Sequence, residues 1–282
     1  MPGGGELRIK RILSLLVIYL FLVTVLIFSL YPILWTVLTS LKTSIETIKN
    51  PYSLPETIQW ANYAQAWVIG RFGTYSWNSI FITVPTVLLI TTLATMTSYA
   101  LSKLKLFGVP AILLFFLLGL MVPFHGFMIP MYYQLRDLDL LNTRWGVILA
   151  LTALALPFAV YLMRSAIIQV PDELIESARL DGANPIQILL MVVTPLIRPT
   201  LVALIVIQSI WAWNEFLIPL LILHKDSLRT VQIGLTFFQT RFSTDFALTA
   251  AGTVIILAPL IVVYLAFQRH FVKGILSGGV KS

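Results

Sequence analysis

Hydrophobic residues fall into six long runs, and the short segments between the runs hold nearly all of the charges. A helix needs roughly 20 mostly apolar residues to cross the hydrocarbon core of a membrane. The first run lies between Arg11 and Lys42, and the others are about Asn78–Leu101, Val109–Met131, Trp145–Met163, Pro199–Leu223 and Phe246–Gln268. The pattern therefore predicts an all-α, polytopic membrane protein in which residues 12–268 form six transmembrane helices.

The first run begins like a secretory signal peptide, because Arg8, Lys10 and Arg11 precede it. It is longer than the about 7–15 apolar residues of a signal peptide, and no small-residue cleavage site closes it. We therefore expect a retained helix after a short N-terminal segment, residues 1–11.

The basic residues around the spans set the expected orientation, since Lys and Arg are enriched in cytoplasmic loops. With the N-terminus inside, eleven of them are cytoplasmic: Arg8, Lys10, Arg11, Lys103, Lys105, Arg164, Arg179, Arg198, Arg269, Lys273 and Lys281. Eight are external: Lys42, Lys49, Arg71, Arg136, Arg144, Lys225, Arg229 and Arg241. This bias favours a plasma-membrane protein with both termini in the cytoplasm, an external loop at about 42–77, a cytoplasmic loop at about 170–199 and a cytoplasmic tail at 269–282.

Composition supports the membrane class and excludes several others. Of the 282 residues, 58% are hydrophobic and 11% are charged, whereas a soluble domain has about 25% charged residues. The net charge is +7, but the basic residues flank apolar runs and do not gather on a soluble face, so no nucleic-acid partner is expected. The chain has no cysteine, which excludes disulfides and thiolate chemistry.

Motifs for chemistry on this chain are absent. The sequence has no G-x-x-x-x-G-K-[ST] phosphate loop, no H-E-x-x-H and no G-x-S-x-G. His125, His224 and His270 lie on separate segments, so we expect no metal site, no cofactor and no catalytic residue. Glu215 and His125 are the only ionisable side chains in the predicted spans, fewer than proton- or sodium-driven carriers usually need. An intramembrane enzyme is excluded for lack of a nucleophile and base, and energy for transport is expected from a separate chain.

The loop from Val170 to Pro199 has the signals of two short helices. Pro171 suits a first helical position, acidic residues follow it, and Gly182 suits a helix end. Asn184 and Pro185 then restart a helix as cap and first position. The expected apolar faces are Leu174 and Ala178 with Ile175 in the first helix, and Ile186, Leu189 and Leu190 in the second. Physical chemistry alone leaves two interpretations open, an interfacial hairpin that anchors the fold or a knob that docks into a partner.

The residues Glu176-Ser177-Ala178-Arg179-Leu180-Asp181-Gly182-Ala183, followed by Val192-Val193-Thr194-Pro195, resemble the EAA loop of ABC importer permeases. The family pattern is E-A-A, three residues, G, nine residues and I-x-L-P. Ser177, Val192 and Thr194 depart from it by replacing alanine, isoleucine and leucine.

Further segments are similar to the carbohydrate branch of these permeases, the branch of the maltose-system subunit MalG. They are Met121–Pro123, Ile129–Tyr132, Leu140–Thr143, the W-N-E-F run Trp213–Phe216 and the glycine-rich ending Lys273–Ser282. The resemblance extends from about Leu30 to Ser282. In the ending, Gly279 and Ser282 replace the alanine and glycine of the branch pattern.

The resemblance implies a six-helix permease subunit with a cytoplasmic EAA coupling loop. It implies a heterodimer with a second permease, two ATPase subunits that bind ATP and Mg, and an extracellular or periplasmic solute-binding protein that delivers a di- or oligosaccharide or related glycoside. The implied ATPase-coupling residues are Glu176, Ser177, Ala178, Asp181, Gly182, Ala183 and Pro195. Alternatives that stay open are a non-sugar solute such as a glycerol phosphate ester, and a structural or export subunit.

Six side chains have the chemistry of a sugar path, because aromatic faces suit the C–H surface of a sugar ring and polar groups suit its hydroxyls. They are Tyr132, Tyr133, Trp211, Trp213, Asn214 and Glu215. The alternative is that the aromatic residues mark the membrane interface and that Glu215 has a structural role.

Overall fold

The computed structural model describes residues 4–239 and 244–279, with side chains described from residue 12 to residue 266 outside that gap. The described residues form helices and one isolated β-bridge, between Gln239 and Thr244. The chain divides into two compact units, Met1–Gly70 with Phe237–Ile255 and Arg71–Thr236 with Ile256–Ser282. This architecture agrees with the predicted all-α class.

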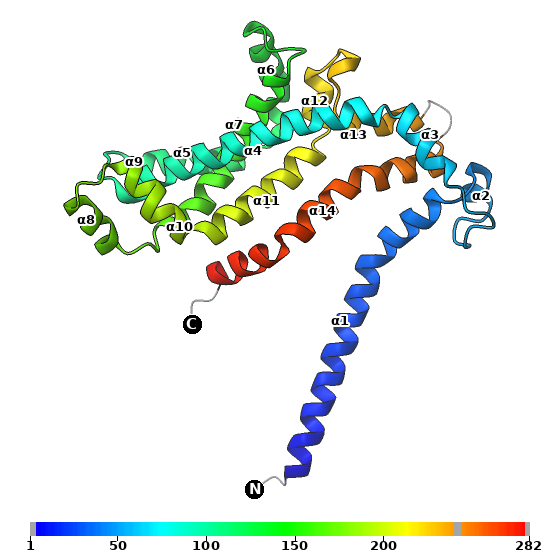
Figure 1. Ribbon diagram of the computed structural model, residues 1–282, viewed down its shortest axis with the longest axis horizontal. Coiled ribbons are helices and arrows are strands. Elements are labelled where there is room, and N and C mark those ends of the chain that lie inside the picture. The colour runs from blue at the N-terminus through cyan, green and yellow to red at the C-terminus, as the bar shows by residue number, and fades with distance from the viewer. Residues whose placement is uncertain (1–3, 240–243, 280–282) are drawn as a thin grey trace. The chain divides into compact units, whose positions relative to one another are not determined.

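Unit 1 contains α1 (Gly4–Ser40), α2 (Ser44–Lys49), α3 (Ala61–Ile69) and the start of α14 (Phe246–Gly279), as Figure 1 shows. Side chains 12–35 of α1 are exposed throughout, although the helix has a mean hydropathy of 2.8 in its most apolar stretch. An exposed helix that is apolar on all sides requires lipid or another protein around it. The predicted first and sixth spans are thus confirmed as continuous apolar helices.

The segment after α1 folds around a buried lysine. Lys42 is 1% exposed, and its Nζ donates to the carbonyl oxygens of Asn50 at 2.9 Å and Pro51 at 3.0 Å. The Asn62 amide donates to the carbonyls of Ser40 and Lys42 at 2.8 Å each. Because these groups satisfy one another locally, the predicted external loop is an ordered segment with two helices of its own.

Unit 2 is organised around α4 (Phe72–Lys103), α7 (Arg144–Ile167) and α11 (Arg198–Asn214). The hydroxyl of Ser98 on α4 donates to the Val160 carbonyl of α7 at 2.8 Å, inside the core. In Figure 1, α8 (Asp172–Leu180) and α9 (Pro185–Ile188) lie at one end of these helices, and α12 (Leu217–Ile222) and α13 (Val231–Gly234) lie away from that end. The remaining elements are η1 (Leu189–Val193), α10 (Thr194–Leu196), η2 (Asp226–Leu228) and η3 (Leu235–Phe238).

The predicted third span is not one continuous helix. It consists of α5 (Val109–Met121) and α6 (Phe124–Asp137), which are bent by 103°. Pro123 disfavours helical geometry at Val122, which takes φ −78° and ψ 117°. With 13 residues, α5 is about 20 Å long, shorter than the about 30 Å of a hydrocarbon core.

The predicted fifth span also ends early, because α11 stops at Asn214 and α12 restarts at Leu217. The apolar segment that extends α11 lies before it: Pro185–Leu196 and α11 are together long and apolar enough to cross a membrane, with a bend of 85° between them. Among the described residues, four helices are long and apolar enough to cross a membrane, and the number rises to six if each bent pair is one span. The predicted count of six therefore depends on the two bent pairs.

Candidate functional site

Two short helices and the turn between them, residues 172–196, form a feature that we call the elbow. Its first helix, α8, begins at Asp172, so Pro171 is the residue before the helix and not its first position as predicted. Asp172 and Glu173 lie in the first turn, where carboxylates stabilise the positive end of a helix. The helix ends at Leu180, as the position of Gly182 predicts.

The turn of the elbow is a Schellman motif. The amide of Gly182 donates to the Arg179 carbonyl and the amide of Ala183 donates to the Ala178 carbonyl, both at 3.0 Å. Gly182 has φ +86°, a left-handed conformation that glycine adopts without steric cost. A Cβ atom built there meets nothing within 4 Å, so this side of the turn is open.

The second half of the elbow begins with a capping box, in which Asn184 and Gln187 bond each other's main-chain amides at 2.8 and 2.9 Å. The helix then widens into the π-turns of η1 and continues to Leu196. Pro195 lacks an amide hydrogen and its ring crowds the preceding turn, which a π-bulge relieves. The hydroxyl of Thr194 donates to the Leu189 carbonyl at 2.7 Å, and the amide of Thr194 donates to the same carbonyl, so this departure from the family pattern gives the widened turn a second hydrogen bond.

The inner face of the elbow matches the predicted one in part, since Ile175 and Leu189 are buried and Ala178 packs against the core. Ile175, Ile188, Leu189 and Val193 are buried in the hydrophobic core of unit 2. Three side chains that we predicted on the apolar faces are exposed instead: Leu174 (43%), Ile186 (63%) and Leu190 (60%). Apolar residues lie on both sides of each helix, so their spacing alone does not identify the inner side.

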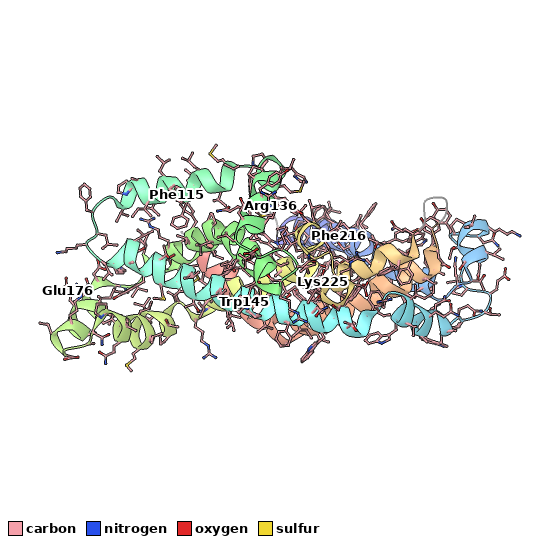
Figure 2. All side chains as sticks on the ribbon, turned by 90° about the horizontal axis from the view of Figure 1, so that it is seen from above. Phe115, Arg136, Trp145, Glu176, Phe216 and Lys225 are labelled. Carbon is pink, nitrogen blue, oxygen red and sulfur yellow. The ribbon has the colours of Figure 1, made fainter. Side chains whose placement is uncertain are left out.

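The outer face of the elbow combines exposed apolar side chains with unpaired carboxylates. Leu180 is 90% exposed and Met191 is 74% exposed. Glu176 and Asp181 are exposed, and no salt bridge in the described part of the chain involves either of them. Figure 2 places Glu176 at the end of unit 2 that the elbow forms, away from Phe216 and Lys225. Ser177 is exposed, whereas Ala178 and Ala183 pack against the core.

A lysine that we used only for topology positions the elbow. Lys103 is the last residue of α4, and its Nζ donates to the Val170 carbonyl at 2.6 Å and to Asp172 Oδ1 at 2.7 Å. Its side chain is 6% exposed. Arg179 donates back to the Lys103 carbonyl at 3.3 Å. The sequence could have indicated this contact, since Lys103 follows the predicted second span on its expected cytoplasmic side, where Asp172 and Glu173 begin the loop.

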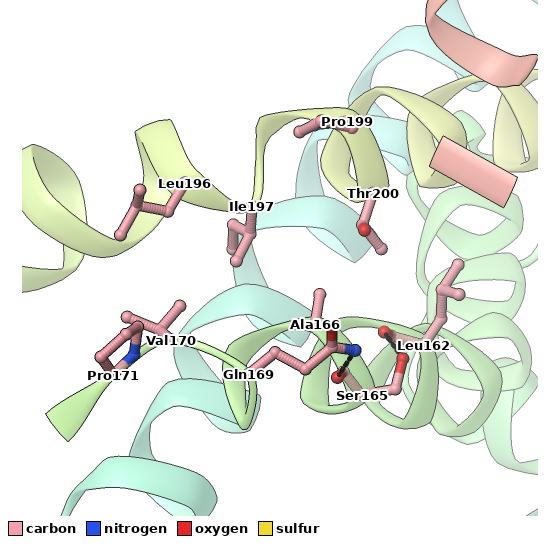
Figure 3. Close-up of a pocket in the computed structure, with 10 residues that line it drawn as sticks. All are labelled: Leu162, Ser165, Ala166, Gln169, Val170, Pro171, Leu196, Ile197, Pro199 and Thr200. Carbon is pink, nitrogen blue, oxygen red and sulfur yellow. Dashed lines mark hydrogen bonds between the residues drawn. The ribbon is translucent and has the colours of Figure 1, made fainter. Parts of the chain in front are cut away.

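A cleft of about 320 Å³ lies under the bend between α10 and α11, as Figure 3 shows. Its lining is mostly apolar, and the Gln169 amide donates to the Ser165 carbonyl at 2.9 Å beside it. Pro199 and Thr200, at the start of α11, line the same cleft. The cleft leaves space next to the joint where the elbow meets α11.

The residues of the predicted sugar path separate into different surroundings. Trp211 is 52% exposed, and its ring lies 5.2 Å from that of Phe158 between centroids at an interplanar angle of 44°. Trp213 is 7% exposed, and its indole donates to the Ile256 carbonyl at 3.2 Å. Glu215 Oε1 accepts from the amides of Leu217 and Ile218 at 2.9 and 3.0 Å, which caps α12. Asn214 accepts from Gln232 at 3.1 Å.

A cavity of about 150 Å³ brings together Trp211 and Glu215 with α4 and α7 residues. The two tyrosines of α6 are not among its lining residues. Tyr132 lies 6.4 Å from the His224 ring between centroids, and the Arg136 guanidinium lies 4.7 Å from the ring centroid of Tyr133. The structure therefore groups two of the six predicted path residues around one cavity.

A polar cluster joins the start of α7 to the loop after α12. Asn142 has φ +57°, and its Oδ1 accepts from the amides of His224 and Lys225 at 2.8 and 2.9 Å. Arg144 donates to Asn78 Oδ1 at 2.8 Å, and Asp226 pairs with Arg71 and accepts from Tyr75 at 2.6 Å. We did not predict this cluster, because its members are far apart in sequence.

This fold and this elbow define a multi-pass membrane permease subunit. The chain belongs to the family described as binding-protein-dependent transport system inner membrane component, whose profile matches residues 102–277. This confirms the predicted class, an ABC-type transport subunit with apolar membrane helices, and agrees with the EAA-loop resemblance.

Individual relatives extend the match over most of the chain. A probable ABC transporter permease of Bacillus subtilis, YurM, is 33% identical over 264 residues, 94% of this chain and 88% of its own. The arabinooligosaccharide permease AraQ of Halalkalibacterium halodurans is 32% identical, covering 90% of this chain and 91% of its own. The trehalose permease SugB of Mycobacterium tuberculosis is 32% identical, covering 90% and 93%.

The fold also matches a solved structure. A chain of a bacterial ABC transporter involved in the import of the acidic polysaccharide alginate superposes with a TM-score of 0.79 at 24% identity. The match covers 96% of this chain and 99% of that one. It supports the helical arrangement described above.

Proposed function

We propose that the chain is the permease subunit of an ATP-binding-cassette importer that moves a di- or oligosaccharide or a related glycoside into the cell. The observation that carries the proposal is the elbow, whose inner face packs into the core of unit 2 and whose outer face exposes large apolar side chains. Relatives that are named for arabinooligosaccharide and trehalose transport support a sugar as substrate.

The outer face of the elbow suits docking to an ATPase subunit. Leu180, Ile186, Leu190 and Met191 are each at least 60% exposed. Burying a side chain of this size contributes about 1.5–3 kcal/mol, so a cleft that covered two of them would provide substantial affinity. Glu176 and Asp181 would add charge-assisted hydrogen bonds at the edge of such an interface.

The elbow is connected to the permease interior through α11. Arg198 begins α11 directly after the 85° bend, and Gln208 follows ten residues later at the 150 Å³ cavity. At 1.5 Å per residue the two positions are about 15 Å apart along the helix. A shift of the elbow that accompanies ATP binding would therefore move cavity-lining side chains on the same rigid helix.

The proposed assembly contains a second permease, two ATPase subunits that bind ATP and Mg, and a solute-binding protein outside the membrane. Both termini and the elbow would lie in the cytoplasm, and residues 42–77 would lie outside. The bare helix α1 supports a partner or lipid along its length, since its side chains 12–35 are exposed.

Reconstitution of the complete transporter in vesicles tests the function. We expect ATP-dependent sugar uptake, and a rise in ATP hydrolysis when binding protein loaded with sugar is added. The permease pair without ATPase subunits should hydrolyse no ATP. Uptake of a glycerol phosphate ester without uptake of any sugar in a panel would replace the proposed substrate, and outward transport alone would replace the importer.

Labelling of single cysteines tests the topology, because the chain has no cysteine of its own. Trp60→Cys and Leu180→Cys place a thiol at positions whose native side chains are 68% and 90% exposed. An impermeant reagent on intact cells should label the first and not the second. The opposite result would invert the proposed orientation.

A further inference from the structure

The 150 Å³ cavity between α4, α7 and α11 contains buried polar groups that the chain itself leaves unpaired. Thr86 is 0% exposed and Gln208 is 1% exposed. Both line the cavity. Within the described residues, neither Thr86 Oγ1 nor Gln208 Nε2 has a hydrogen-bond partner.

Burying a donor or acceptor without a partner costs free energy. Nine buried side-chain atoms in the described part of the chain lack a partner, and those of Thr86 and Gln208 are the two whose residues line this cavity. Native proteins retain such unpaired groups where water or a ligand completes the bonds. The cavity is large enough for this, since 150 Å³ corresponds to about five water molecules at about 30 Å³ each.

The cavity lies at the depth where a transported solute would pass. Thr86 is the 15th of the 32 residues of α4, so it lies near the middle of a helix that is long enough to span the membrane. In many secondary transporters the substrate site lies near the bilayer midplane, and the cavity lies at a comparable position along α4.

The other lining groups complete the chemistry of a sugar subsite. Trp211 provides a half-exposed aromatic face, and Glu215 provides a carboxylate with one oxygen engaged in the α12 cap. Ile90, Leu154 and Ile218 make the rest of the lining apolar. A few polar groups within an apolar cavity are typical of small-molecule sites.

We propose that this cavity is a hydroxyl-binding subsite on the sugar path, in which Thr86 and Gln208 contact the passing sugar and Trp211 lies against its ring. The inference rests on the proposed function, because it names further contact residues for the same substrate. It adds two residues to the path, one on α4 and one on α11, that sequence patterns did not indicate.

The first test measures sugar uptake by the complete transporter with Thr86→Val and Gln208→Met, which keep side-chain size and remove the polar atoms. We expect kcat/KM to fall about 3- to 10-fold for each, the effect of one hydrogen bond. Thr83→Val is the matched control, since Thr83 is also buried on α4 with an unpaired hydroxyl but does not line the cavity. Its kcat/KM should change less than about twofold.

The second test detects occupancy directly, with partner cysteines removed beforehand. Gln208→Cys should react with a small thiol reagent more slowly when loaded binding protein and ATP drive transport, whereas Thr83→Cys should not respond to sugar. Slower reaction of Gln208→Cys together with the uptake losses supports the subsite.

Two outcomes separate the inference from the proposed function. If the wild-type transporter moves sugar but both cavity variants match it in uptake and Gln208→Cys ignores sugar, the cavity holds only water and the subsite is wrong. If the wild-type transporter moves no sugar, the proposed function itself is wrong.

Discussion

The elbow and the cavity are joined by α11, but they differ in whether their polar groups have hydrogen-bond partners within the described part of the chain. In the elbow, the helix ends are satisfied within the chain by the Schellman motif at Gly182 and the capping box at Asn184. In the cavity, Thr86 and Gln208 are buried and unpaired. A region whose hydrogen bonds are made internally can move as a rigid body. A region with unpaired polar groups is stabilised when a ligand or water forms the missing hydrogen bonds.

The elbow and the cavity also differ in how far their apolar side chains are exposed. The elbow exposes large apolar side chains on its outer face, whereas most of the apolar residues that line the cavity are buried or half-buried and Trp211 is the exposed exception. The first arrangement suits a protein partner that covers a surface, and the second suits a small solute that enters a space. Three substitutions test this contrast and a fourth tests the polar cluster of Asn142; the largest effect is expected at the elbow.

Gly182→Leu should weaken ATPase binding roughly 30-fold to several-thousandfold. A leucine at positive φ costs roughly 1–2 kcal/mol, and a side chain inserted between the elbow and a docked ATPase costs about 1–3 kcal/mol more. Each 1.4 kcal/mol of lost binding free energy is about a tenfold loss of affinity. Co-purification of the ATPase subunit measures the loss.

Gly108→Leu is the matched control for this substitution. Gly108 also has positive φ, at +78°, and also has nothing within 4 Å of a built Cβ, but it lies between α4 and α5. An equal loss of ATPase binding in the two variants would show that backbone strain alone causes the loss, and the docking interpretation of Gly182 would be wrong.

Asn142→Ala should destabilise the region opposite the elbow by about 2–3 kcal/mol. The change removes two hydrogen bonds, to the amides of His224 and Lys225, each of about 0.5–1.5 kcal/mol, and places alanine at φ +57°. Thermal unfolding of the purified complex measures it. Asn142→Asp keeps an oxygen acceptor and tolerates this φ, so it should retain most of the stability; an equal loss in both variants would contradict the assigned contact.

Lys103→Met should loosen the elbow by about 1–3 kcal/mol, because the buried Val170 carbonyl loses its partner. Hydrogen exchange of residues 172–180 should rise, and ATPase binding should fall with it. Lys105→Met, at an exposed position two residues beyond the end of α4, should change neither quantity. If hydrogen exchange in α8 stays unchanged in Lys103→Met, Lys103 does not position the elbow.

Glu215→Gln should have the smallest effect on stability, below about 1 kcal/mol, because glutamine keeps an oxygen that accepts from the α12 amides. Sugar uptake should nevertheless fall by about 2- to 10-fold, since a charged acceptor at the cavity becomes neutral. Wild-type uptake in this variant would show that Glu215 serves only as a helix cap.

The sequence alone was sufficient to predict the features that depend on residues close together in the chain, namely apolar helices and helix ends. Runs without charges predicted the membrane helices, because the hydrocarbon core excludes charge whatever the tertiary structure. Gly182 and Asn184 predicted the turn of the elbow, because a left-handed residue and an N-cap act within one helical turn.

The tertiary structure decided which side of each helix faces inward and which distant residues meet. Ile188 is buried and Ile186 is exposed, a choice that depends on the angle at which the elbow packs against α4 and α7. Lys103 meets Val170 across 67 residues, and Thr86 meets Gln208 at one cavity only because α4 and α11 pack together. Local propensity carries no information about such contacts, because their free energy arises only after the chain has brought distant helices together.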